Sequence, residues 1–393
     1  MSGPFLGVAL TAGGWHPQAW REDGARAQDF FTAGYWVDLV AEAERGVLDF
    51  VTFEDEFTLQ SPYAGAPARR VDHVTGRLDA VLTAARVAPT ARGIGLLPTA
   101  TVAHTEPFQL SKAIATLDFV SGGRAGVRLR AGANATEARH FGRREFPDSP
   151  VGTADWRRAV AAAFTEVSDY AEVIRRLWDS WEDDAEIRDV ATGRFVDRDK
   201  LHYIDFHSEH FSVRGPSITP RPPQGQPLVT VLAHQQDGFE LIARSADLGL
   251  VTPRNPAQLG QIRAAIRAAS PERTLPDPPI VVADVVVFLD GSEAAARARK
   301  ERLDLLEGAE FGSDATVFTG SPTDLADLIE DWHAAGADGI RLRPATIPDD
   351  LTRIVEEVVP VLQQRGVRPS RYDGSSLRER FELTAAINRY APA

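Results

Sequence analysis

The regular alternation of short apolar runs with longer amphipathic runs constrains the fold more than any other feature of this sequence. The short runs, rich in β-branched residues, predict eight strands at residues 5–9, 50–53, 94–99, 125–130, 228–232, 250–252, 281–289 and 340–342. Helical periodicity fills the intervals at residues 35–45, 78–86, 107–119, 170–181, 239–246, 257–268, 293–306, 322–335 and 351–364. Eight βα units predict a (β/α)8 TIM barrel, and the missing G-x-G-x-x-G after the first strand disfavours a doubly wound sheet.

Two segments stand outside this alternation. Residues 183–226, between the predicted helix 170–181 and the strand 228–232, are polar and include "ITPRPPQGQP". A long irregular insertion of this kind is usually a lid, a binding loop or a dimer contact. The tail, residues 366–393, is expected to pack across the barrel or onto a partner subunit. We therefore predict that residues 1–393 form one barrel domain with an insertion and a C-terminal extension.

Charge and cysteine content exclude several classes of function. The formal net charge of -13 argues against nucleic-acid and anionic-membrane partners, which both require a basic face. The absence of cysteine removes disulfides, thiolate metal sites and a cysteine nucleophile. The N-terminus lacks the pattern of a signal peptide, and no apolar run approaches the ~20 residues that span a bilayer. These features predict a cytoplasmic protein.

In a TIM barrel the chemistry lies where the strands end. The polar residues that follow the predicted strands are His16, Glu54, Asp55, Glu56, Thr99, Thr101, His104, Asn134, His234, Gln235 and Arg343, with Trp15 among them. Such a ring suits a planar or partly charged ligand. Each member also has a structural interpretation: Asp55 as a helix cap, His16 and His104 as satisfied hydrogen-bonding side chains, and Trp15 as part of the wall.

The histidine-rich run "LHYIDFHSEH" (202, 207 and 210 are histidines) raises the possibility of a metal site. The alternation of residues 207, 209 and 211 with 208, 210 and 212 favours a hairpin within the insertion instead. We therefore predict no metal site. The run Glu54-Asp55-Glu56 does not suit a glycosidase, because neighbouring side chains at a strand end point to opposite sides.

Four segments resemble a known family. "YWVDLVAEAERGVLDFVTFEDEF" (residues 35–57) and "IGLLPTATVAHTEPFQLSKAIATLDFVSGGRAGVRL" (residues 94–129) resemble the luciferase-like flavin monooxygenases. Residues 178–227 and 320–351 resemble, more specifically, the nitrilotriacetate and dibenzothiophene-sulfone monooxygenases. The resemblance implies a barrel, often homodimeric, that binds reduced FMN at the carboxyl ends of its strands. It also implies an NAD(P)H-dependent flavin reductase as a partner, and O2 and a small organic molecule as substrates.

The resemblance assigns roles to individual residues. Asp55 matches an acid beside the isoalloxazine ring, and Thr99 and Thr101 match hydroxyl residues at its edge. His16 matches a substrate-side position, where a protonated imidazole would stabilise an anion, and His104 stands where the subgroup often has Tyr. We predict that these two histidines are catalytic and that the other three residues bind the cofactor.

The sequence also departs from the family pattern. The Asn that faces the flavin is replaced by Arg128, a fixed cation that would favour an anionic reduced flavin. The phosphate loop retains only Gln235 and Gly238, and Phe164 falls near the family's phosphate-gripping Arg-Tyr pair. The candidates to replace that pair are Arg143, Arg157 and Arg158. Two alternatives follow: a barrel that uses F420, whose longer tail would suit Arg128 and Arg130, and a flavin-poor, non-catalytic binding subunit.

Overall fold

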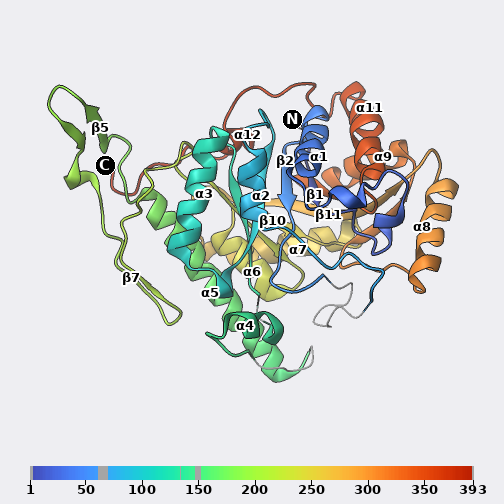
Figure 1. Ribbon diagram of the computed structural model, residues 1–393, viewed down its shortest axis with the longest axis horizontal. Helices are drawn as coiled ribbons and strands as arrows, with labels where there is room; N and C mark the ends of the chain where they lie inside the picture. The colour runs from blue at the N-terminus through green and yellow to red at the C-terminus, as the bar shows by residue number, and fades with distance from the viewer. Residues whose placement is uncertain (1–2, 61–69, 133, 147–151, 392–393) are drawn as a thin grey trace.

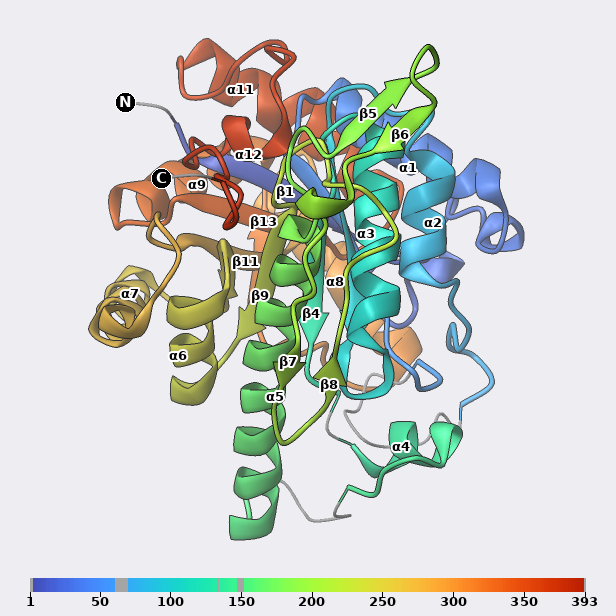
Figure 2. The same ribbon diagram turned by 90° about the vertical axis from the view of Figure 1, so that its left-hand side faces the viewer.

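Parallel strands form a closed barrel in the computed structural model, which describes residues 3–60, 70–132, 134–146 and 152–391. The eight barrel strands are β1 (Phe5–Leu10), β2 (Phe50–Phe53), β3 (Gly95–Thr101), β4 (Gly126–Arg130), β9 (Leu228–Ala233), β10 (Leu248–Val251), β11 (Ile280–Leu289) and β13 (Gly339–Pro344). Pairing of β10 with β11 closes the sheet, and helices surround it (Figures 1 and 2). The predicted TIM barrel is confirmed.

One further strand, β12 (Thr316–Gly320), was not predicted. It pairs with the second half of β11, from Val285 opposite Thr316 to Leu289 opposite Gly320. The first half of β11 pairs with β10, so a single long strand serves two neighbours on one edge. The run "TVFTG" had the β-branched composition of a strand, but it is short and only partly buried.

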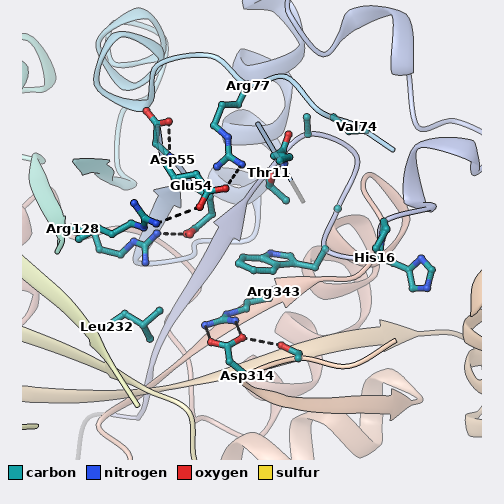
Figure 3. A pocket seen from close by; sticks show the side chains of 18 of the residues that line it. Thr11, His16, Glu54, Asp55, Val74, Arg77, Arg128, Leu232, Asp314 and Arg343 are labelled. Carbon is teal, nitrogen blue, oxygen red and sulfur yellow. Dashed lines mark hydrogen bonds and ion pairs between the residues drawn. The ribbon is translucent and has the colours of Figure 1, made fainter. Parts of the chain in front are cut away.

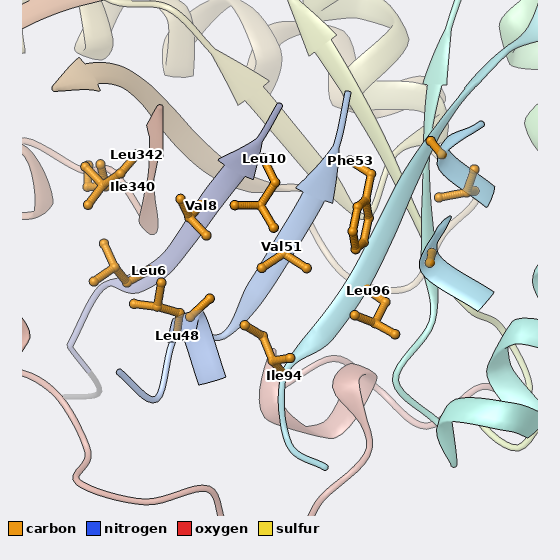
Figure 4. Close-up of a cluster of buried hydrophobic side chains, with 14 of the residues drawn as sticks. Leu6, Val8, Leu10, Leu48, Val51, Phe53, Ile94, Leu96, Ile340 and Leu342 are labelled. Atoms are coloured by element: carbon orange, nitrogen blue, oxygen red, sulfur yellow. The ribbon is translucent and has the colours of Figure 1, made fainter. Parts of the chain in front are cut away.

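The main core lies between the barrel and its helices. Alternate residues of the strands, such as Leu6 and Val8 of β1 and Val51 of β2, point outward and are fully buried (Figure 4). Helix α1 (Ala33–Arg45) covers this region and begins at Thr32, whose hydroxyl accepts a hydrogen bond from the amide of Tyr35. Burial of each such side chain stabilises the fold by roughly 1.5–3 kcal/mol, so the outer face of the sheet is well anchored.

Most of the other helices agree with the prediction in place and differ mainly at their ends, whereas one helix is additional and the predicted helix 351–364 is divided. The other helices are α2 (Ala80–Val87), α3 (Pro107–Ser121), α4 (Ala135–Phe141), α5 (Ala154–Asp179), α6 (Gln236–Ser245), α7 (Pro256–Ala269), α8 (Glu293–Glu307), α9 (Pro322–Ala334), α10 (Asp349–Arg353) and α11 (Val359–Gln364). Helix α4 was not predicted, and α5 begins at Ala154 rather than at 170. A π-helical turn, Ile354–Val358, joins α10 to α11 just before Pro360. In the described part of the chain, no helix combines the length and apolarity needed to cross a membrane.

The insertion contains two small hairpins beside α3 and α5 (Figure 2). Strand β5 (Glu186–Asp189) pairs with β6 (Arg194–Val196), and β7 (Phe206–His207) pairs with β8 (Ser212–Val213). The second pair is the hairpin that the alternation around residue 207 predicted. Among the described residues, no group of three or more His, Cys, Asp or Glu side chains is placed to hold a metal ion.

The C-terminal tail packs across the amino end of the barrel. Leu377, at the start of the short helix α12 (Leu377–Arg380), and Phe381 join the barrel-interior residues Phe50 and Leu97 in one apolar cluster. The tail then reaches the insertion, where the ring of Tyr390 stacks on His202 with centroids 3.9 Å apart. We still predict that the whole chain forms one domain, and these contacts agree with that prediction.

Candidate active site

A cavity of about 910 Å³ opens at the carboxyl ends of the strands. Its described wall includes the loop after β1 (Thr11 to Trp20), residues 54–56, 60, 73–74 and 77 of the loop after β2, the ends of β4, β9 and β13, and residues 307–314 after α8. The size lies within the range of small-molecule and cofactor sites. The sequence also predicts that Pro62 and Tyr63 help to line the pocket, and both lie outside the described residues.

Buried charged side chains line the floor of this cavity (Figure 3). Arg128 of β4 donates to the Glu54 carboxylate and, through Nε, to Thr99 Oγ1 at 2.9 Å. Arg341 of β13 lies 3.1 Å from Glu54 and donates to Asp284 of β11 at 2.8 Å. Burial alone would raise the pKa of Glu54, but the two arginines outweigh it and hold that pKa below its usual value. Burial lowers the pKa of Arg128 to about 10, so Arg128 and Glu54 are both charged at neutral pH.

Sequence reasoning identified Arg343 at a strand end but missed Arg341 and Asp284, which belong to the same floor. Arg341 and Arg343 are two residues apart on β13, so both point into the barrel, and both donate to Asp284. A detectable signal was present: charged residues stand inside strands that are otherwise apolar, once in "VVADVVVF" and at two alternate positions in "GIRLRP". Charged residues are rarely buried unless paired, so such positions predict an interior ion-pair network.

The loop after β1 packs over Arg343. The amide of Trp15 donates to Pro344 O at 3.0 Å, and the Trp15 ring lies over the Arg343 guanidinium, 4.6 Å from its carbon. Arg343 also donates to Asp314 at 2.6 Å (Figure 3). Gly14 adopts a φ of +120°, and a Cβ there would lie 2.4 Å from Ala345 O, so only glycine allows this approach.

Of the two histidines predicted to be catalytic, only His16 lines the cavity among the residues described there. Its Nδ1 accepts from the Gln18 amide at 3.1 Å, and Nε2 lies 3.1 Å from Asp304 Oδ1. These partners specify a neutral imidazole that donates through Nε2, and burial lowers the pKa of His16 accordingly. Both ring nitrogens hold the loop, and the catalytic role of His16 stays a prediction.

His104 lies outside the described wall of the cavity, in an aromatic cluster. Its ring stacks on Phe141 with centroids 4.7 Å apart and meets the edge of Phe57 at 6.2 Å. The Nε2 atom is buried without a hydrogen-bond partner among the described residues. Burial lowers the pKa of His104, which favours the neutral ring. Its predicted catalytic role is likewise untested.

The predicted cofactor-binding residues at β2 and β3 are engaged within the protein. The Asp55 carboxylate accepts from the amide of Ala80 at 2.9 Å, at the start of α2, and from the amide of Glu56 at 2.8 Å. The contact with the Ala80 amide fits the capping interpretation; Asp55 also lines the cavity, and its role in cofactor binding stays a prediction. Thr99 and Thr101 accept from Arg128 and Arg130, and the described wall includes these arginines but neither threonine.

The residues predicted to bind the phosphate, Gln235 and Gly238, lie at the start of α6. Gln235 is the N-cap residue, but its side chain makes no capping hydrogen bond, so the first-turn amides lack that partner. Gly238 allows close packing, since a Cβ there would lie 2.7 Å from Ala233 Cβ. Phe164 of α5 lines the cavity beside this turn.

The three arginines proposed as replacements for the family's phosphate-binding pair have partners elsewhere. Arg143 pairs with Glu106 at 2.6 Å, Arg157 donates to Gly152 O at 2.7 Å, and Arg158 pairs with Asp155.

The polar atoms around the cavity fit a flavin ring. Trp15 Nε1 and Arg77 Nε are buried donors without partners among the described residues, and Gln60 Oε1 is a buried acceptor in the same condition. All three residues line the cavity. A planar ring whose edge carries carbonyl oxygens and an N–H group satisfies both kinds of atom, and buried polar groups are normally satisfied.

The known proteins to which this chain is similar include several monooxygenases. The chain is 28% identical to N-acetyl-S-(2-succino)cysteine monooxygenase of Bacillus subtilis (strain 168), over 98% of both chains. It is 27% identical to nitrilotriacetate monooxygenase component A of Aminobacter aminovorans, over 98% of both, and 26% identical to dibenzothiophene-sulfone monooxygenase of Rhodococcus erythropolis, over 93% of both. The solved structure of EDTA monooxygenase from Chelativorans sp. BNC1 superposes with a TM-score of 0.79 at 23% identity, covering 98% of this chain and 99% of the other. The model of the luciferase-like monooxygenases matches residues 12–340, and the chain belongs to this family.

Proposed function

We propose that this chain is the oxygenase of a two-component system. It takes reduced FMN from a separate NAD(P)H-dependent flavin reductase and uses O2 to oxidise a small organic molecule in the cavity. Family membership makes the chain an oxidoreductase, as predicted, and argues against the non-catalytic alternative. Because the reductase uses NAD(P)H, the proposal places both proteins in the cytoplasm.

One observation carries the cofactor assignment: the buried, unpartnered atoms of Trp15, Arg77 and Gln60 surround a cavity at the strand ends. In the proposal these residues hold the edge of the ring, and the uncapped first turn of α6 receives the phosphate. Bound reduced flavin supplies the electrons that activate O2. The chain's own residues orient the ring, exclude water and keep the floor charges in place.

FMN is favoured over F420. The F420 alternative rested on Arg128 and Arg130 as free cations for a long anionic tail. Arg128 is paired with Glu54, and Arg130 with Glu137 at 2.5 Å, so neither offers an uncompensated charge. We also propose a homodimer, which light scattering after size-exclusion chromatography tests directly.

Stopped-flow mixing tests the proposed function. Protein with photoreduced FMN is mixed with aerated buffer, and flavin reoxidation is followed against FMN alone. We expect bound flavin to reoxidise at a rate distinct from that of free flavin. A rate unchanged across excess protein would overturn the proposal, and a parallel titration that favours F420 over FMN would replace the cofactor.

A pair of tryptophan variants localises the site. Trp15→Phe keeps an aromatic ring but removes the unpartnered N–H donor, so we expect weaker FMN binding. Trp181→Phe is the matched control, because Trp181 Nε1 already donates to Ser217 O at 2.8 Å in the insertion. Equal FMN affinity in both variants would show that Trp15 does not hold the ring.

A further inference from the structure

The arginines on the described wall of the cavity are each neutralised by a carboxylate of the protein. Arg77 pairs with Glu56 at 2.9 Å, and Arg130 pairs with Glu137 at 2.5 Å and with Glu56 at 3.4 Å. Deeper in the barrel, Arg128 pairs with Glu54, and Arg343 pairs with Asp284 and Asp314. These four arginines therefore present no uncompensated positive charge to a ligand.

The carboxylates of the same wall are matched as well. Glu307 accepts from Arg70 and lies within 2.8 Å of His73, and Gln18 donates to it at 2.9 Å. Glu310 lies 3.7 Å from Lys300. The others are held by the arginines named above, or, for Asp55, by two backbone amides.

Two histidines of the wall also have partners within the protein. His16 faces Asp304 at 3.1 Å, and His234 lies 2.9 Å from the Thr252 hydroxyl and 3.5 Å from Asp314. Burial lowers the pKa of both, so both are neutral at pH 7. Apart from Asp55, which two backbone amides stabilise, each charged side chain of the described wall thus has a partner of opposite charge.

Much of the rest of the described wall is apolar or aromatic. It includes Trp20, Val74, Phe164, Leu241 and Phe311. An ion that leaves water for such a cavity loses hydration and, Asp55 aside, finds no free counter-charge, which makes its entry costly. A neutral molecule meets no such cost.

We infer that the molecule oxidised in this cavity is an uncharged organic compound, and that polycarboxylates are excluded. The inference rests on the proposed function only in that the substrate shares this cavity with the cofactor. The charge pairing itself is a property of the protein, so it is tested without flavin.

Collisional quenching of Trp15 fluorescence measures the sign of the charge that the cavity admits. The probes are anionic iodide and cationic caesium, at high constant ionic strength so that the field of the whole acidic chain is screened. The Trp15 signal is the difference between wild type and Trp15→Phe. Quenching constants are divided by those of free N-acetyltryptophanamide. We expect a corrected iodide-to-caesium ratio close to one.

Two variants, one at each residue of the Glu56–Arg77 ion pair, change the charge of the cavity in opposite directions. Glu56→Gln removes the acid shared by Arg77 and Arg130, and should raise the ratio at least about threefold. Arg77→Gln removes the cation and should lower the ratio by a similar factor. Glu42→Gln, on the surface of α1 beside Arg45, is the control and should change nothing.

The outcomes separate this inference from the proposed function. A wild-type ratio well above or below one, or a ratio that neither Glu56→Gln nor Arg77→Gln shifts, overturns the uncharged cavity. Oxidation of a polycarboxylate with reduced FMN would overturn the inference while supporting the proposed function. Failure of reduced FMN to interact with the protein would overturn the proposed function and leave the quenching result standing.

Discussion

Arg128 of β4 donates a hydrogen bond to the carboxylate of Glu54, which directly follows β2, across the intervening strand β3. The cation that the sequence places at a flavin-facing position is therefore already paired inside the barrel. An arginine in that pair contributes a fixed dipole rather than a net charge. Its effect on an anionic ligand is correspondingly smaller than that of a free guanidinium.

The first prediction concerns the stability of this pair. Glu54→Gln leaves Arg128 buried with Thr99 as its remaining partner, so we expect a loss of about 3 kcal/mol or more in the free energy of unfolding. Urea denaturation followed by circular dichroism measures it. Arg297→Met on α8 is the matched control, because its pair with Glu293 is exposed and should contribute less than about 1 kcal/mol.

A double variant isolates the interaction. Glu54→Gln combined with Arg128→Met removes both charges, and should be less destabilised than the sum of the single variants. If the two single losses simply add, the pair is not a coupled unit and the description of the cavity floor is wrong.

The barrel was predictable from the sequence because each strand carries its own signal. Residues 50–53 form a continuous apolar run, and β2 has these bounds in the structure. Strand β12 escaped because it is short, partly exposed and paired with only half of one neighbour. Helix α5 escaped in its first half because the run from Ala154 to 169 has few buried residues, so the helical stripe fades there.

The site was less predictable because its charges are matched in space rather than in sequence. Asp55, Arg128 and His16 do line the cavity, as their strand-end positions suggest. Nothing in a linear pattern pairs Arg128 with Glu54, 74 positions away. Glu307 is the last residue of α8 and Asp314 lies in the segment after it, where there is no strand-end signal, so both enter the site only through the fold.

The second prediction concerns the packing of α6. Gly238→Ala places a Cβ 2.7 Å from Ala233 Cβ, so the helix must shift from β9, at a cost of about 1–3 kcal/mol. Gly260→Ala in α7 is the control: nothing lies within 4 Å of its Cβ, so it should stabilise the helix by roughly 0.5–1 kcal/mol. Thermal melting distinguishes the two. Equal shifts would show that α6 tolerates the methyl group.

The third prediction is a pH dependence of stability. Asp118 is fully buried, and burial raises its pKa to about 6, although amides of Gln224 and Ala125 donate to it. The unfolded value is about 3.9, so between these values the folded protein holds a proton that the unfolded chain has lost. This group therefore contributes stability that is fully present below about pH 4 and is lost as pH rises through 6, by up to about 3 kcal/mol.

The measurement is a difference between variants. Wild type should gain stability over Asp118→Asn as the pH falls from 7 to 5, since the variant cannot take up the proton. Asp331→Asn, exposed on α9, controls for the loss of a carboxylate. A gap between wild type and Asp118→Asn that stays constant over this range would contradict the assignment.

The fourth prediction concerns the C-terminal tail as a plug of the barrel. Leu377 is fully buried against Phe50 and Leu97, and its Cδ1 would lie 2.5 Å from a Cβ added at Gly95. Leu377→Ala leaves a cavity in that cluster, so we expect a loss of about 2–5 kcal/mol in the free energy of unfolding. Leu305→Ala is the matched control, because Leu305 is 83% exposed on α8 and makes the same chemical change outside the core. Urea titration of both variants decides the point: a tail that merely lies along the surface would give equal, small effects, whereas a plug makes Leu377→Ala much the larger.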